Sequence, residues 1–258
     1  MFLHLVRRII KRPTTLKKGE RLWEVDFLRG IAVLMMLVSN FAFDLSLFTG
    51  IQTSNTFFWP TLARATAALF LLLVGVSLTL SLAKSAAAGV RFPKFFKRGI
   101  TIFSLGLLVS LGTWYAFGDD LVVFGILHLI GFGIILAYPF LRHPVISFIV
   151  GIVVIAGGWF VRTKIVSFPW LIWLGIQYHG FSSVDFTPVF PWFGFILVGV
   201  FLGNFLFPGG GRRAVLAGDP ALFPVRAIGK IGTRSLIIYF VHQPVFWGGF
   251  WVWQQIFK

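Results

Sequence analysis

The chain of 258 residues contains 57% hydrophobic and 12% charged residues and has a formal net charge of +15. Soluble domains contain about 25% charged residues, and the apolar residues here form blocks of about 20, the length of a membrane-spanning helix, which excludes a soluble globular domain. The positive charge lies in short segments between these blocks, a pattern typical of membrane orientation that argues against nucleic-acid binding.

Seven spanning helices are predicted after a basic segment, residues 1–20, that is expected in the cytoplasm. The fold class is therefore all-α, a polytopic transmembrane bundle, with residues 21–258 as a single domain. The predicted spans are 25–47, 57–83, 98–117, 121–141, 145–161, 190–207 and 232–253. No small-residue cleavage site follows the N-terminal apolar stretches, so the first span is expected to remain as an anchor. The chain has no cysteine, which excludes disulfides and thiolate metal sites, and we expect no metal.

The distribution of basic residues predicts the orientation. With seven spans, eighteen of the 23 Lys and Arg residues lie on the side of the N-terminus, three lie on the other side, and Arg29 and Arg64 fall inside spans. Positively charged loops stay in the cytoplasm. The N-terminus is therefore expected inside and the C-terminus outside.

Residues 165–178 (IVSFPWLIWLGIQY) are apolar, but they are short and interrupted by proline. An eighth span here would place the basic loop 208–234 outside, against the charge distribution. We therefore expect an interfacial or re-entrant segment on the outer face, where tryptophan is common.

Polar side chains inside the predicted spans are the candidates for a site, because an ionisable group at mid-depth costs a few kcal/mol. Asp26 and Arg29 lie three residues apart at the inner end of the first span, so they share a face and can pair. Asn40 follows Arg29 by eleven residues, about three turns, which places it on the same stripe about 16 Å away. Asp44 lies one turn further out. An interfacial ion pair and a simple interhelical amide contact are the alternatives.

Two further polar groups lie at a similar predicted depth. Arg64 is seven residues into the second span from the outside, and His128 is seven residues into the fourth. The shared depth with Asn40 favours one site on three helices. The alternatives are that His128 is a core histidine and that Arg64 is the counter-ion of Asp44.

His242 lies near the middle of the last span and is followed by Pro244. Proline removes a helix hydrogen bond and frees a carbonyl. Such a break is tolerated where it lines a cavity, which makes His242 a second intramembrane candidate. No Walker loop, dinucleotide fingerprint or nucleophile elbow is convincing.

Five segments resemble the transmembrane acyltransferases, and within them the bacterial and archaeal membrane family related to the catalytic domain of heparan-alpha-glucosaminide N-acetyltransferase. These segments are 21–32 (RLWEVDFLRGIA), 69–81 (LFLLLVGVSLTLS), 124–128 (FGILH), 190–194 (FPWFG) and 235–244 (SLIIYFVHQP). The first and last are the most specific. The resemblance covers nearly everything from 21 to 253.

The resemblance implies transfer of an acetyl group from cytoplasmic acetyl-CoA to a hydroxyl or amine, often of a glycan across the membrane. It places Asp26 and Arg29 in the signature at the inner end. One residue departs from the broader group, in which the position eleven after this arginine is commonly a catalytic histidine. Here that residue is Asn40, and residues 41–56 contain no histidine. His128 and His242 are then the remaining intramembrane bases.

The sequence therefore predicts a membrane acetyltransferase in the cell membrane, with acetyl-CoA as the acyl donor and a glycan or small molecule as the acceptor. The residues expected near the CoA phosphates are Asp26, Arg29, Lys97, Arg98 and Arg234. His128 is predicted as general base ahead of His242, with Asn40 or Arg64 stabilising the oxyanion. The rival hypotheses are a transporter or flippase of a lipid-linked or glycan substrate and a non-catalytic protein of the same fold. A homo-oligomer is left open.

Overall fold

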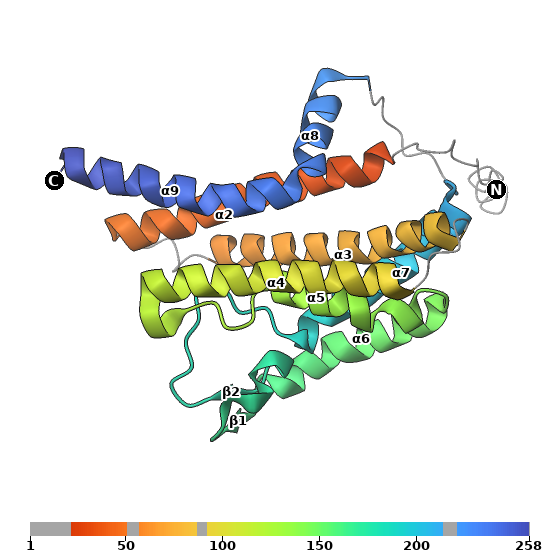
Figure 1. The fold of residues 1–258 in the computed structure, drawn as a ribbon, viewed down its shortest axis with the longest axis horizontal. Coiled ribbons are helices and arrows are strands. Elements are labelled where there is room, and N and C mark those ends of the chain that lie inside the picture. The colour runs from red at the N-terminus through yellow and green to blue at the C-terminus, as the bar shows by residue number, and fades with distance from the viewer. Residues whose placement is uncertain (1–21, 51–56, 87–91, 214–220, 258) are drawn as a thin grey trace. The chain divides into compact units, whose positions relative to one another are not determined.

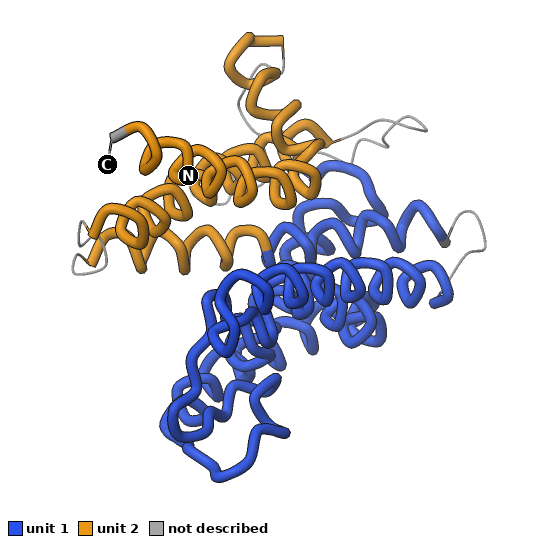
Figure 2. The backbone as a smooth tube through the Cα atoms, turned by 60° about the vertical axis from the view of Figure 1, so that its left-hand side comes forward, with its two compact units in different colours: residues 1–18, 71–215 blue, residues 19–70, 216–258 orange. Residues whose placement is uncertain are grey.

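The computed structural model describes residues 22–50, 57–86, 92–213 and 221–257. The chain divides into two compact units (Figure 2). The central unit contains Leu71–Val215, and the terminal unit contains Gly19–Phe70 and Leu216–Lys258. The position of one unit relative to the other is not determined, so each is described by itself. The expected single domain over 21–258 therefore stays a prediction.

Eight α-helices account for most of the described residues (Figure 1). They are α2 (Trp23–Thr49), α3 (Phe58–Ala86), α4 (Phe92–Phe117), α5 (Ile126–Leu136), α6 (Pro144–Val161), α7 (Val189–Leu206), α8 (Phe223–Thr233) and α9 (Ser235–Phe257). Four 3-10 turns lie between them, at Gly118–Asp120, Tyr138–Phe140, Pro169–Leu174 and Pro208–Gly210. The strands are β1 (Ile165–Val166) and β2 (Gln177–Tyr178), which pair in parallel.

The predicted all-α polytopic fold is confirmed. Among the described residues, five helices are long and apolar enough to cross a membrane, namely α2, α3, α4, α6 and α7. The seventh predicted span corresponds in position to α9. The count of seven spans and the orientation stay predictions.

The fourth predicted span, 121–141, is wrong in its length, because α5 contains only 11 residues. Its start is fixed by Asp185, whose Oδ2 accepts a hydrogen bond from the N–H of Ile126 at 3.1 Å. Beyond its end, Pro139 lies in a 3-10 turn and has no N–H to continue the helix. A helix of this length extends about 16 Å, roughly half of the hydrocarbon core.

Residues 165–178 and the basic loop 208–234 are not predicted to span the membrane, and the second of these segments contains a helix. Residues 165–178 form no spanning helix, because β1 and β2 enclose the 3-10 turn Pro169–Leu174. The segment 208–234 contains α8, which the hydrophobic blocks did not indicate. Only about half of its residues are apolar, and they are distributed along one side of a short helix.

In the terminal unit, α2 and α9 lie side by side along much of their length, and α8 runs across that direction (Figure 1). The crossing of α2 and α8 depends on two glycines. A Cβ added at Gly232 would lie 1.8 Å from the carbonyl oxygen of Asp26, and one added at Gly30 would lie 2.0 Å from that of Ile228. The two backbones are therefore in direct contact.

The central unit uses the same kind of packing between its apolar helices. Gly75 of α3 meets the backbone of α7 at Ile196, and Gly199 of α7 meets the backbone of α3 at Leu72. Gly194 of α7 approaches the backbone of α6 in the same way. Small residues at helix contacts are typical of membrane bundles, because close backbone approach increases van der Waals contact where no hydrophobic effect operates.

Large apolar side chains cover the outer faces of the long helices. On α4 the side chains of Leu107, Leu108 and Leu111 are exposed, and on α6 those of Ile149 and Val153 are exposed. A soluble protein would expose such continuous apolar faces only at an interface. Here they are the surface expected against lipid chains.

The orientation can be tested with single cysteines, because the native chain has none. Ser182 and His143 are both exposed and lie in loops that the charge distribution assigns to opposite sides. We expect Ser182→Cys to react with an impermeant thiol reagent added outside intact cells and His143→Cys to react only after permeabilisation. The reversed labelling pattern would contradict the predicted orientation.

Candidate functional site

Two of the polar residues in the predicted stripe on α2, Asn40 and Asp44, face α9 within the terminal unit. Asn40 and Asp44 lie one turn apart on α2, and both form side-chain hydrogen bonds to α9. Aromatic contacts continue the same interface, with Phe41 against Phe246 and Phe48 stacked on Phe250. The α2–α9 contact therefore combines an apolar seam with two successive polar pairs.

The first pair joins Asn40 to His242, with 2.8 Å between Asn40 Nδ2 and His242 Nε2. The opposite ring nitrogen, Nδ1, lies 2.7 Å from the carbonyl oxygen of Tyr239 and 3.2 Å from that of Ile238. Because a carbonyl only accepts, Nδ1 carries the proton and Nε2 presents its lone pair to the amide of Asn40. His242 is thus held as the neutral tautomer whose Nε2 can act as a base.

The second pair centres on Asp44, whose side chain is completely buried. Gln243 Nε2 donates to both carboxyl oxygens at 2.9 and 3.1 Å, and Trp247 Nε1 donates to Oδ1 at 3.1 Å. The remaining amide oxygen, Gln243 Oε1, is buried without a hydrogen-bond partner. These three residues form the Asp44 network. Arg64 is exposed on α3, and among the described residues no ion pair joins it to Asp44.

Pro244 lies inside α9 directly after the two residues that contact α2. It has no N–H to donate to the preceding turn, so α9 lacks one backbone hydrogen bond at this point. The side-chain contacts of His242 with Asn40 and of Gln243 with Asp44 both lie in the turn directly before Pro244. These contacts hold the imidazole of His242 in position at a point where the helix lacks a backbone hydrogen bond.

At the opposite end of α2, the predicted ion pair is present. Arg29 donates from Nη1 to Oδ1 of Asp26 at 2.8 Å, and both side chains are partly exposed. The backbone of α8 meets α2 at Asp26 through Gly232. Arg234, which is exposed, directly follows α8. The structure thus brings Asp26 and Arg29 together, with α8 packed against the same end of α2.

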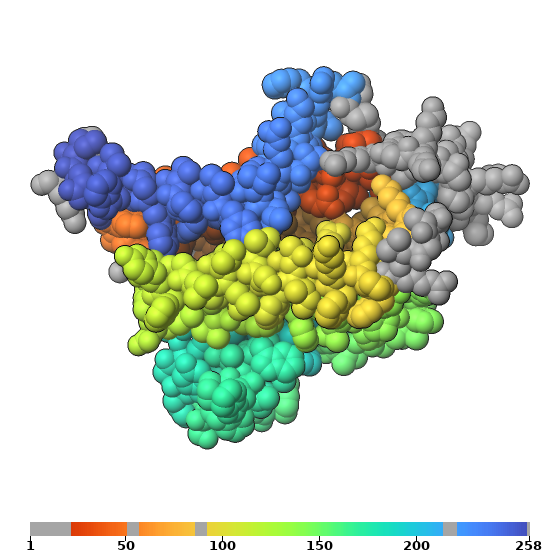
Figure 3. Space-filling model, viewed as in Figure 1, coloured from red at the N-terminus to blue at the C-terminus, as the bar shows by residue number. Residues whose placement is uncertain are grey.

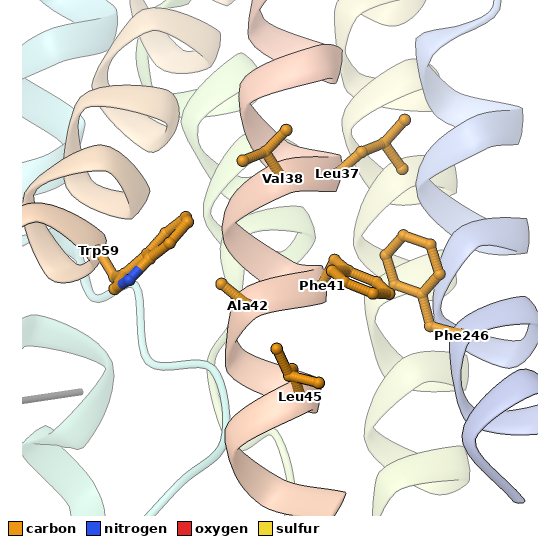
Figure 4. Close-up of a pocket in the computed structure, with 7 residues that line it drawn as sticks. All are labelled: Leu37, Val38, Phe41, Ala42, Leu45, Trp59 and Phe246. Atoms are coloured by element: carbon orange, nitrogen blue, oxygen red, sulfur yellow. The ribbon is translucent and has the colours of Figure 1, made fainter. Parts of the chain in front are cut away.

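An apolar groove of about 410 Å³ lies beside the C-terminal half of α2 (Figure 4). Its lining residues are Leu37, Val38, Phe41, Ala42, Leu45, Trp59 and Phe246. Neither Asn40 nor His242 reaches it. Apart from the indole nitrogen of Trp59 the lining is apolar, so the groove suits an acyl chain better than a glycan.

His128 lies in the central unit, where both ring nitrogens are occupied. Nδ1 accepts the N–H of Gly125 at 3.2 Å, and Nε2 lies 3.4 Å from Ser110 Oγ. The ring is stacked against Phe124, and Gly106 of α4 leaves just enough room for it. With 2% of its surface exposed, the side chain has the contacts of a core histidine.

The predicted residues divide between the two units. Asp26, Arg29, Asn40, Arg64, Arg234 and His242 belong to the terminal unit, whereas Lys97, Arg98 and His128 belong to the central unit. The predicted cluster of Asn40, Arg64 and His128 therefore stays a prediction. Sequence reasoning missed Gln243 and Trp247 as partners of Asp44. Their spacing of four residues on one helix face was the available signal.

Comparison with known families gives one match over most of the chain. The model of the family described as heparan-alpha-glucosaminide N-acetyltransferase, catalytic, matches residues 21–244. The matched region includes the predicted site residues of the terminal unit, from Asp26 to His242, whereas Trp247 of the Asp44 network lies beyond it. No curated protein and no solved structure matches the chain. The chain belongs to the family of the heparan-alpha-glucosaminide N-acetyltransferase catalytic domain.

Proposed function

We propose that this chain is an acetyltransferase of the cell membrane that moves an acetyl group from cytoplasmic acetyl-CoA to a hydroxyl or amine of a glycan-type or small-molecule acceptor across the membrane. The observation that carries this proposal is the hydrogen bond between Asn40 and a neutral His242 on two apolar helices, in a chain of an acetyltransferase family. A half-buried amide beside a base is the pair of groups that acyl transfer from a thioester requires.

The proposed reaction uses Nε2 of His242 as the general base. Nε2 takes the proton of the acceptor as its oxygen or nitrogen attacks the thioester carbonyl carbon. The amide N–H of Asn40 turns from Nε2 to the carbonyl oxygen, where negative charge develops. The C–S bond then breaks, and the protonated imidazole returns the proton to the leaving thiolate of CoA. The carbonyls of Tyr239 and Ile238 stabilise the imidazolium through Nδ1.

The donor is proposed to bind at the inner end of α2. Arg29 is held by Asp26 with part of its surface open, and guanidinium groups bind phosphate oxygens in charge-assisted pairs. Arg234 at the end of α8 is a second proposed phosphate contact. Lys97 and Arg98 of the central unit are proposed as further phosphate contacts because they are basic residues on the predicted cytoplasmic side.

Purified protein in nanodiscs tests the function directly. We expect saturable binding of acetyl-CoA and slow release of CoA that accelerates when an amine or hydroxyl acceptor is added. A transporter would instead move a labelled glycan across a vesicle membrane without any dependence on acetyl-CoA. A non-catalytic protein would show neither activity.

Arg29→Ala is expected to weaken CoA binding by about tenfold or more, because a charge-assisted contact contributes about 2 kcal/mol. Isothermal titration of the wild type and the variant measures this change. Arg142→Ala, which removes another exposed arginine, serves as the control and should bind CoA normally. Unchanged CoA affinity in folded Arg29→Ala would leave Arg29 as an interfacial anchor only.

A further inference from the structure

The orientation of α8 sets it apart from the other described helices of the terminal unit. It runs across the direction of α2 and α9 (Figure 1), and it stands out from them in the space-filling view (Figure 3). The glycine contact of Gly232 with Asp26 and Gly30 fixes it to the end of the membrane-spanning α2. A helix that crosses a spanning helix at its end lies along the membrane surface.

The two sides of α8 differ in chemistry. Ile228 packs against α2 at Gly30. The opposite side presents Arg226 and Lys230, one turn apart and both exposed. Phe223, at the start of the helix, has 83% of its surface exposed. Among the described residues, neither Arg226 nor Lys230 forms an ion pair.

Helices that lie in the membrane interface have this composition. Basic side chains on the polar face contact anionic headgroups, and a large apolar side chain enters the boundary of the acyl region. Each Lys or Arg near an anionic membrane surface contributes about as much as a fivefold change in affinity. The residues Ala221–Phe257 contain no Asp or Glu, so no carboxylate on α8 or α9 opposes this attraction.

We propose that α8 lies in the headgroup layer and binds anionic phospholipid through Arg226 and Lys230, with Phe223 inserted beside the acyl chains. The proposal concerns lipid binding and is independent of the acetyl-transfer chemistry. It uses neither Arg29 nor Arg234.

Native mass spectrometry of the full chain tests the proposal. The purified protein is incubated with equal amounts of phosphatidylglycerol and phosphatidylcholine, and the retained lipids are counted. We expect the wild type to retain phosphatidylglycerol preferentially, less so at high salt. Arg226→Gln/Lys230→Gln should lower that preference about tenfold or more. Phe223→Ser should reduce retention of both lipids.

Matched variants separate these effects from loss of charge or apolar surface. Arg142→Gln/Arg162→Gln removes the same charge from exposed positions elsewhere, and Phe57→Ser removes a phenylalanine that is 86% exposed. Both controls should retain lipid as the wild type does.

An unchanged lipid preference in Arg226→Gln/Lys230→Gln would overturn the proposal. So would loss of CoA binding together with retained phosphatidylglycerol, because the basic residues would then serve the donor. If the double variant does not fold, Phe223→Ser and a salt titration of the wild type decide, and salt-independent retention overturns the proposal.

Discussion

Replacing His242 by Gln is expected to lower acetyl transfer by about 10²–10⁴-fold, the usual contribution of a general base. Glutamine places an amide near the position of Nε2, so the contact with Asn40 is retained while the base is removed. Binding of CoA and the melting temperature should therefore remain close to those of the wild type. The measurement is acetyl transfer by the purified variant, with CoA affinity and melting temperature recorded beside it.

His128→Gln is the matched comparison, and it reverses the order expected from the sequence. Both ring nitrogens of His128 are engaged by Gly125 and Ser110, and the ring fits against Gly106. We expect this variant to have a lower melting temperature. Its acetyl transfer should fall only in proportion to the fraction of protein that is unfolded. If folded His128→Gln loses transfer while His242→Gln keeps it, the base is His128, as the predicted depth indicated.

The second large effect is expected at Asp44. In Asp44→Leu the half-buried donors of Gln243 and Trp247 lose this acceptor, and a buried donor left unsatisfied costs about 1–3 kcal/mol. The side-chain contact beside Pro244 is lost as well, so His242 is less well positioned against Asn40. We therefore expect a clear fall in melting temperature, measured by tryptophan fluorescence. Acetyl transfer should fall by more than about tenfold.

Asp44→Asn is the control for this prediction. Its Oδ1 can still accept from Gln243, and its new N–H groups can donate to Gln243 Oε1, the buried atom that has no partner in the wild type. The variant should therefore keep most of its stability and transfer. If Asp44→Asn is as damaged as Asp44→Leu, the carboxylate charge itself is required. Wild-type stability of Asp44→Leu would contradict the proposed role of the network.

Much of the fold could be predicted because lipid imposes a simple rule on the sequence. A helix exposed to lipid must be apolar for its whole length, and α2, α3, α6 and α7 begin and end within a few residues of the predicted spans. The rule fails where helix length is set by tertiary contacts. Asp185 fixes the start of α5, and a contact with a residue so far along the chain is not visible in a continuous apolar block.

The candidate site was predictable along each helix and unpredictable between helices. Spacing on α2 correctly grouped Asn40 with Asp44 and Asp26 with Arg29, because the helix repeat is known. The residues that face this stripe depend on which helix packs against α2 and on the rotation of that helix about its axis. Because α9 is apolar on nearly all sides, its sequence does not show which side faces α2. The partnership of Asn40 with His242 therefore required the structure. Depth alone had grouped Asn40 with His128, which belongs to the other unit.

The backbone contacts at Gly30, Gly75, Gly199 and Gly232 invert the usual relation between side-chain size and evolutionary constraint. In a water-soluble core, the largest buried side chains tolerate replacement least, because each fills a cavity of its own shape. Here the bulky leucines and isoleucines of the outer faces meet a fluid that adapts to any apolar shape, so they are free to interchange. The glycine positions determine how close the helices approach. Sequence variation in this chain should therefore be slowest at these glycines.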